Sequence, residues 1–330
     1  MQLPAAGASG PPVLIACVGH CAVDHVFQVQ RFPGRPTKTA AQRYQVVGGG
    51  MAANAALACA RLGARVRFIG AVGPDEAGRL VREQLAAEGI DLRHLQEVPA
   101  GHTSATAVIV DGEGERYIFN HRGDALALAR LPDDAAFAGC DAVLVDPRWP
   151  AGARAALSWA RAHGKISVLD ADVAPQADLA LLVPLARWAV FSEPGLAVWS
   201  GPVAQEAALL RAIHLGASHA AVTLGAAGLM LVSDARLHRI AGCAVPAVDT
   251  TGAGDVFHGA LTLALARGLA PVPACRYASA AAALKCTRPD GIRGAPNAAE
   301  LAAFMARMQA EAPPGPRDAP GDAALRSLTP

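Results

Sequence analysis

The chain has 330 residues, of which 29 are Lys or Arg and 28 are Asp or Glu, so its formal net charge is +1. This balance excludes a broad nucleic-acid surface as the main function, and 52% hydrophobic with 17% charged residues excludes a disordered chain. Three of the cations are lysines, Lys38, Lys165 and Lys285. An Arg-rich composition explains the scarcity of lysine, but it leaves open why these three positions kept it.

Short apolar strands alternate with Ala-rich helices through most of the chain. The predicted strands cover residues 13–19, 65–70, 141–146, 166–170, 188–191 and 220–224. The predicted helices cover residues 51–62, 76–88, 152–163, 203–214, 253–267, 273–285 and 297–309. This alternation predicts one α/β domain over residues 13–311, with a mostly parallel sheet covered by helices on both faces. The Pro-, Gly- and Ala-rich ends, 1–12 and 312–330, are predicted to be flexible tails.

Two further regions, at about 25–47 and 103–121, are predicted to form antiparallel ribbons. In the first, residues 25–30 pair with 39–47, and in the second, 103–110 pair with 115–120 through the turn sequence DGEG. Ligands of open α/β proteins bind at the carboxyl ends of the parallel strands. We therefore expect the ribbons to form a lid that excludes water from a site there.

Several patterns concern the environment of the protein. No apolar run reaches the ~18 residues of a membrane span, and the first residues lack the pattern of a secretory signal. The seven cysteines include no CxxC pair, which favours reduced thiols. No His/Cys cluster has metal-ligand spacing, so no zinc site is expected. We expect a cytoplasmic protein without membrane or nucleic-acid partners.

The most informative motif is VDTTGAGDVFHGAL, which opens a predicted helix. Gly252 and Gly254 let the backbone turn tightly at the helix start. The amides of Ala253, Gly254 and Asp255 would then point outward at the positive end of the helix dipole and form an anion hole. Asp255 would lie at its mouth, where a carboxylate accepts the proton of an attacking hydroxyl. The motif predicts phosphoryl transfer; the alternative is a turn in which Asp255 is a plain N-cap.

This motif resembles the second signature of the ribokinase-like (PfkB) carbohydrate kinases. Residues 46–78 resemble the first signature, a run of glycines before a helix that carries an Asn. The resemblance covers about residues 13–310 and implies a three-layer α/β/α sandwich with a small β-sheet lid. It also implies that ATP phosphorylates a sugar hydroxyl, with Asp255 as the base. The residues that it implies for the sugar are Asp24 after the first strand, Gly48, Gly49, Gly50 and Asn54.

The nucleotide side is identified by resemblance as well. Residues 221–228 resemble the family's phosphate segment, and 282–296 resemble the segment that walls the adenine. The resemblance implies an ATP site that includes Thr223, Gly225, Gly228, Gly252, Gly254, Ala283 and Cys286.

The expected metal ions are Mg²⁺ and a monovalent cation such as K⁺. In the family an Asn-x-x-Glu motif organises Mg²⁺, but here Ser192 and Gly195 take the Asn and Glu positions. Glu193 would then act through water. By the same resemblance, Asp249 and Thr251 would lie beside the monovalent cation.

Three residues, each next to a lid strand or just after a strand of the main sheet, point to an anionic substrate. Lys38 and Arg148 supply two cations and Asn120 an amide donor, which together suit an anionic group on a sugar. Each alone is compatible with a solvated surface group. Residues 143–153 and 282–296 are closely similar to the sulfofructose-phosphorylating members of the family, in which a Lys, an Asn and an Arg surround the sulfonate. That resemblance implies transfer to the C1 hydroxyl of 6-deoxy-6-sulfofructose, giving 6-deoxy-6-sulfofructose 1-phosphate.

Other functions stay open at this point. The same cations suit 2-keto-3-deoxygluconate or fructose 6-phosphate, and a ribokinase or fructokinase with a neutral sugar is a further alternative. A non-catalytic sugar-binding relative is disfavoured by the intact Asp255. A dinucleotide-dependent dehydrogenase is excluded because residues 18–25 lack GxGxxG. The lid edges and the family resemblance favour a homodimer that forms through the lids.

Overall fold

The computed structural model describes residues 12–113 and 115–311, so the predicted tails lie outside the described residues apart from Pro12. Its main layer is a nine-stranded sheet in the order β13-β12-β11-β10-β9-β8-β1-β4-β5. Seven neighbouring strands run parallel: β1 (Leu14–Val18), β4 (Arg65–Val72), β5 (Asp91–Glu97), β8 (Ala142–Val145), β9 (Ile166–Ala171), β10 (Trp188–Ser192) and β11 (His219–Thr223). An antiparallel hairpin of β12 (Leu229–Ser233) and β13 (Arg236–Ile240) completes one edge.

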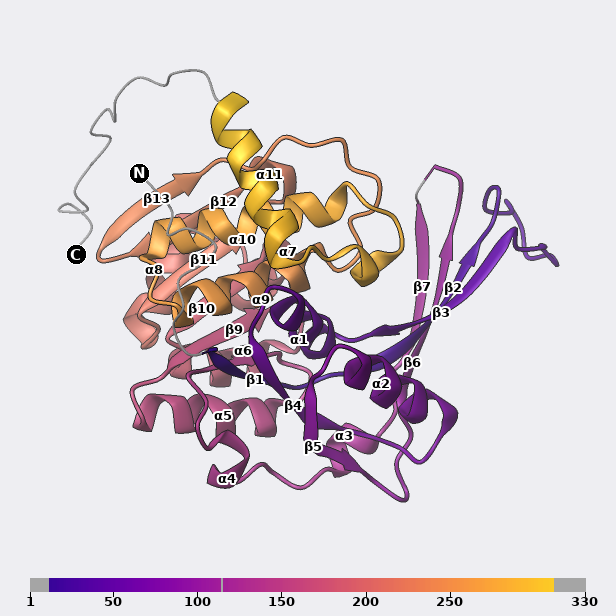
Figure 1. Cartoon of the computed structure of the whole chain (residues 1–330), viewed down its shortest axis with the longest axis horizontal. Helices are drawn as coiled ribbons and strands as arrows, with labels where there is room; N and C mark the ends of the chain where they lie inside the picture. The colour runs from indigo at the N-terminus through magenta and orange to yellow at the C-terminus, as the bar shows by residue number, and fades with distance from the viewer. Residues whose placement is uncertain (1–11, 114, 312–330) are drawn as a thin grey trace.

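Helices cover both faces of this sheet, as predicted (Figure 1). One face carries α1 (Met51–Arg61), α2 (Glu76–Ala87), α9 (Ala253–Ala266), α10 (Pro271–Cys286) and α11 (Ala298–Glu311). The other carries α4 (Asp134–Phe137), α5 (Pro150–Ala162), α6 (Gln176–Leu182), α7 (Glu193–Ser200) and α8 (Gln205–Leu215). Within β1, Ile15 and Cys17 enter the first core and Ala16 enters the second. Because alternate side chains enter opposite cores, these strands are apolar throughout.

The lid is a separate four-stranded sheet in the order β3-β2-β6-β7, which projects from the body of the molecule (Figure 1). Its strands are β2 (Ala22–Gln28), β3 (Arg43–Gly49), β6 (Ser104–Val110) and β7 (Arg116–His121). The two predicted hairpins are present, but β2 and β3 are shifted from the predicted bounds. The two hairpins are joined into one small sheet, because β2 of the first hairpin pairs in parallel with β6 of the second.

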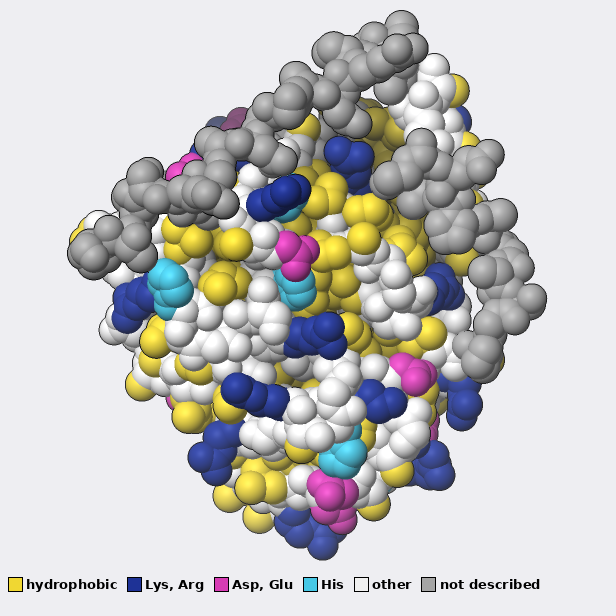
Figure 2. All heavy atoms as spheres, turned by 90° about the vertical axis from the view of Figure 1, so that its left-hand side faces the viewer, with side chains coloured by type: hydrophobic (Ala, Val, Ile, Leu, Met, Phe, Trp, Pro, Cys, Tyr) yellow, Lys and Arg dark blue, Asp and Glu magenta, His cyan; other side chains and the backbone are white. Residues whose placement is uncertain are grey.

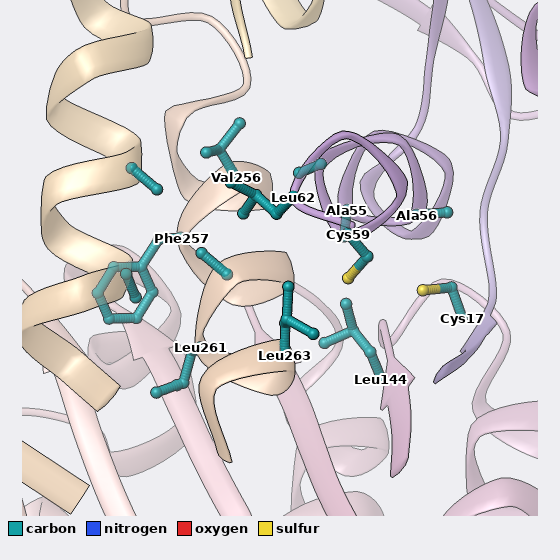
Figure 3. Close-up of a cluster of buried hydrophobic side chains, with 14 of the residues drawn as sticks. Cys17, Ala55, Ala56, Cys59, Leu62, Leu144, Val256, Phe257, Leu261 and Leu263 are labelled. Atoms are coloured by element: carbon teal, nitrogen blue, oxygen red, sulfur yellow. The ribbon is translucent and has the colours of Figure 1, made fainter. Parts of the chain in front are cut away.

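Helices α1 and α9 pack closely in the first core (Figure 3). A Cβ built on Gly259 would lie 2.7 Å from the carbonyl oxygen of Ala55, and the Cys59 thiol donates to the carbonyl of Gly259 at 3.2 Å. The glycine therefore allows the two helix backbones to approach each other. This approach fixes the first turn of α9 relative to the first turn of α1.

Sequence analysis missed several elements. The hairpin of β12 and β13 turns at Asp234 and Ala235, which adopt φ values of 51° and 56°. Such turns usually contain Gly, so the turn signal was absent from the sequence. Also missed were β5, the short helices α3 (Ala125–Leu128), α4 and α6, and α7.

The surface agrees with the charge balance of the sequence. On the side away from the lid, Lys and Arg side chains are spread among hydrophobic and other side chains rather than gathered in one patch (Figure 2). Among the described helices, none is long and apolar enough to cross a membrane.

Candidate active site

The candidate base Asp255 lies in the first turn of α9, at the carboxyl-end side of the parallel sheet. Gly252 precedes the helix with a φ of 75°, a left-handed conformation that favours glycine. The amides of Gly254 and Asp255 follow in the first turn, where a helix has no intrahelical carbonyls for its N–H groups. The predicted anion hole needs one correction, because the Ala253 amide already donates to the carbonyl of Thr250 at 3.2 Å.

A hydrogen bond joins the two signature motifs. The Asn54 Nδ2 group, in the first turn of α1, donates to Asp255 Oδ2 at 2.7 Å. Burial and the nearby charge of Asp170 raise the pKa of the Asp255 carboxyl well above its ordinary value, and the Asn54 hydrogen bond opposes this shift. A carboxylate with a raised pKa is a better proton acceptor, which is the property that a general base requires.

On the sugar side, Asp24 follows the first strand, as predicted, and lies within β2. Burial raises the pKa of its carboxyl, while a hydrogen bond from the Thr106 hydroxyl lowers it. A cavity of about 240 Å³ next to this strand is lined in part by Gly48, Gly49 and Asn54. Asp24, the glycines before α1 and Asn54 therefore lie close together.

Close contacts within the protein explain why three glycines precede α1, and sequence analysis did not anticipate these contacts. A Cβ on Gly49 would collide with the Asp24 carboxylate, and one on Gly48 would collide with the Gln84 amide. Gly50 has a φ of 96° and packs against the backbone of residues 20 and 21. Close protein contacts thus require a glycine at each of these positions, and contact of the glycines with sugar stays a prediction.

Asn120 is connected to Asp24 across the lid. Its Nδ2 donates to Thr106 Oγ1 at 2.9 Å, and the Thr106 hydroxyl bonds to the Asp24 carboxylate. Asp24, Thr106 and Asn120 are direct partners in the strand register, so their side chains share one face of the lid sheet.

Arg148 and Arg122 are cations close enough to His20 for their charges to act on its imidazole. Burial, together with the charges of Arg148 and Arg122, lowers the pKa of His20 to about 4. The His20 Nε2 atom is buried and has no hydrogen-bond partner. By contrast, Lys38 lies exposed in the loop between β2 and β3, and no hydrogen bond or ion pair joins it to any of these three described residues. Asn120 thus lies beside Thr106 in the lid sheet, Arg148 lies just after β8, and Lys38 lies in the exposed loop between β2 and β3. Joint binding of one anion by these three residues stays a prediction.

The predicted nucleotide residues outside the GAGD motif lie in β11, in the turn after it and in α10. Thr223 ends β11 and donates its hydroxyl to the carbonyl of Phe191 at 3.3 Å. Gly225 and Gly228 form the following turn with φ values of 56° and 98°. Ala283 and Cys286 lie at the end of α10, and the Cys286 carbonyl accepts hydrogen bonds from the amides of residues 248 and 249.

Comparison with known proteins identifies the family. Residues 13–298 match the model of the pfkB family carbohydrate kinases. The chain belongs to this family. It is 30% identical over 301 residues to a ribokinase of Haemophilus influenzae, covering 88% of this chain and 98% of that protein. It is 29% identical over 279 residues to a fructokinase of Vibrio alginolyticus, covering 78% of this chain and 91% of that protein.

Solved structures agree with the sequence comparison. The kinase superposes on a candidate ribokinase from Agrobacterium tumefaciens with a TM-score of 0.87 and 36% identity, covering 92% of this chain and all of that one. It superposes on a ribokinase from Thermotoga maritima with a TM-score of 0.78 and 28% identity, covering 89% and 99% of the two chains. The protein is therefore an ATP-dependent carbohydrate kinase with the ribokinase-like fold.

Carboxylates near the ends of β9 and β10 suit a Mg²⁺ ion bound with ATP. Ser192 caps α7 by accepting from the Gly195 amide at 3.0 Å, and it donates to Asp172 Oδ1 at 2.6 Å. Glu193 follows at the first position of α7, where its carboxylate accepts from Gln205. Among the described residues no three potential ligands converge, which fits an ion held mainly by phosphates and water. Asp172 and Glu193 are the residues that would hold it through water.

Sequence analysis missed a buried acidic group beneath the site. Asp146, directly after β8, accepts hydrogen bonds from the amides of His20, Ala52 and Arg148 at 2.7–3.0 Å. Asp170, near the end of β9, lies 3.4 Å from the imidazole of His258. The signal that would have found both aspartates is their place at the carboxyl ends of neighbouring parallel strands.

The assignment of Asp255 as the base predicts the effect of removing its charge. Asp255→Asn should lower kcat by about 10²–10⁴-fold, because the amide cannot accept the hydroxyl proton. ATP-dependent turnover of a sugar panel measures the effect, and circular dichroism with thermal melting checks the fold. The matched control is Asp134→Asn, at an exposed position on α4. Near-normal turnover in folded Asp255→Asn would contradict the assignment.

Proposed function

We propose that this kinase transfers the γ-phosphate of ATP to the C1 hydroxyl of 6-deoxy-6-sulfofructose, giving 6-deoxy-6-sulfofructose 1-phosphate. The observation that carries the proposal is that two cations, Arg148 and Arg122, act on the buried imidazole of His20, whose Nε2 atom has no hydrogen-bond partner among the described residues. His20 and Arg148 follow β1 and β8, which are neighbours in the main sheet, and Arg122 follows β7 of the lid sheet.

The chemistry of a sulfonate fits these groups. A sulfonate stays anionic at physiological pH, and its oxygens need several donors to replace water. A neutral sugar would form no charge-assisted hydrogen bonds with the arginines, so it would bind less favourably than an anionic sugar. Asn120 adds an amide from the lid, and Lys38 would join when its exposed loop closes over the substrate.

The residues then have distinct roles. The sugar would bind Asp24, the amides of Gly49 and Gly50, and Asn54, which orients its C1 hydroxyl toward Asp255. Asp255 would accept the hydroxyl proton as the oxygen attacks the γ-phosphate, and the amides at the start of α9 would stabilise the developing charge. Bound Mg²⁺ supplies further charge neutralisation on the phosphates. The use of ATP, together with seven unpaired cysteines, supports our proposal of a cytoplasmic location.

A second candidate function is ribokinase or fructokinase activity. It is favoured by the relatives, which are named ribokinases and fructokinases. A panel of sulfofructose, fructose 6-phosphate, 2-keto-3-deoxygluconate, fructose and ribose with ATP and Mg²⁺ separates the candidates. A kcat/KM for fructose or ribose at or above that for sulfofructose would exclude the proposed specificity.

The proposed anion contact makes a prediction for Arg148. Arg148→Ala should lower kcat/KM for sulfofructose by about 10–100-fold, because a charged hydrogen bond contributes ~1.5–3 kcal/mol, and it should change the value for fructose little. Steady-state kinetics on both sugars measures the difference, with the exposed Arg154→Ala on α5 as the matched control. An equal loss on both sugars would assign Arg148 a structural role.

We also propose that the kinase forms a homodimer through its lids. Phe27, Tyr44, Tyr117 and Phe119 lie on the face of the lid sheet opposite Asp24, and the last three are 53–65% exposed. A hollow of about 760 Å³ is lined by Phe27, Phe32, Tyr117 and Phe119 together with neighbouring loop residues. Exposed aromatic groups of this extent are typical of a surface that another chain covers. A second copy of the lid fits best, because it would bury both aromatic faces at once.

Sedimentation velocity tests the dimer. The wild type should sediment as a dimer, and Phe119→Glu as a monomer, because a buried carboxylate at the interface is costly. Leu215→Glu, an exposed apolar position on α8, is the matched control and should remain dimeric. A monomeric wild type at micromolar concentration would contradict the proposal.

A further inference from the structure

Lys285 is an unusual buried cation. It lies in the last turn of α10 with 0% exposure, and it is one of three lysines in a chain of 330 residues. Its Nζ donates to the carbonyl oxygen of Asp249 at 2.7 Å and lies 3.7 Å from Asp249 Oδ1. A fully buried ammonium is stable only with such oxygen partners, so its position is determined by the loop that contains Asp249.

Asp249 connects the two loops that flank the anion hole. Its Oδ1 atom accepts from the Thr251 amide and its Oδ2 atom from the Gly291 amide, both at 2.8 Å. Burial opposes ionisation of this carboxyl, but the two amides and the charge of Lys285 hold its pKa below the ordinary value. Asp249 thus joins the loop before α9 to the loop after α10. It lies three residues before Gly252, where the anion hole starts.

A monovalent cation at this place would need the same oxygen atoms. The carbonyl of Asp249 already accepts from the Lys285 ammonium, and both carboxylate oxygens accept backbone amides. These contacts do not fit the K⁺ site expected from the family resemblance. They supply instead one positive charge and a fixed loop geometry from within the chain.

We propose that the ammonium of Lys285 replaces a monovalent cation beside the anion hole, so that the kinase does not depend on K⁺. The inference rests on nucleotide binding and phosphoryl transfer at this site, and not on the identity of the sugar. The positive charge that positions the Asp249 loop, and through it the amides of Gly254 and Asp255, is then always present.

The wild-type enzyme provides the first test. Melting temperature with ADP, and ADP affinity by calorimetry, are measured in KCl and in tetramethylammonium chloride at equal ionic strength. We expect ADP affinities within twofold and unchanged melting temperatures. A fivefold or greater gain in ADP affinity specific to K⁺ would overturn the proposal. Because neither readout needs a sugar, a failure of the sulfofructose assignment does not affect this result.

Lys285→Ala provides the second test, because it removes the charge and leaves room for an ion. We expect about tenfold weaker ADP binding and a lower melting temperature, with K⁺ restoring at least part of both losses. A variant that binds ADP normally without K⁺, or an impaired one that K⁺ does not restore, would overturn the cation role. Lys165→Ala, in the turn after α5, is the matched control. If Lys285→Ala does not fold, the wild-type comparison still decides the question.

Discussion

The close contact between α1 and α9 is the constraint on which the site depends. Gly259 lets the helices approach, and this brings their first turns within hydrogen-bonding distance at Asn54 and Asp255. Asn54 belongs to the half of the chain that forms the sugar side, and Asp255 opens the half that forms the phosphate side. One packing contact in the core therefore aligns two motifs that lie 201 residues apart in the sequence.

The same arrangement brings other buried aspartates close enough to Asp255 for their charges to act on it. Burial raises the pKa of the Asp146, Asp170 and Asp255 carboxyls above their ordinary values, and the aspartates reinforce one another. Backbone amides stabilise the Asp146 carboxylate, and the positive charge of Arg148 opposes the repulsion in part. A site of this kind favours cations, which is consistent with a Mg²⁺ ion bound together with ATP. The buried ammonium of Lys285 is stabilised separately, by the carbonyl and carboxylate oxygens of Asp249.

Much of the fold was predictable from local patterns. Apart from β5, the parallel strands are largely apolar runs, the long helices are Ala-rich, and the GAGD motif marked the start of α9 directly. The β12–β13 hairpin was not predictable, because Asp234 and Ala235 make its turn without glycine. The roles of Asp146, His20 and Lys285 were not predictable either, because each depends on contacts between segments that only the tertiary structure brings together. Conversely, Lys38 was predicted from its place in the chain, and its exposed loop leaves that prediction to experiment.

The contact between Asn54 and Asp255 is tested most directly by the pH dependence of kcat/KM. As the proposed base, Asp255 would act in its ionised form, so activity should fall as pH decreases through its pKa, which burial raises above the ordinary value. The Asn54 amide stabilises the ionised form, so Asn54→Ala should move the acidic limb to higher pH. A shift of about 1 pH unit, equivalent to ~1.4 kcal/mol, is expected for one hydrogen bond to a charged group. An acidic limb at the wild-type position in a folded, active Asn54→Ala enzyme would contradict the central claim.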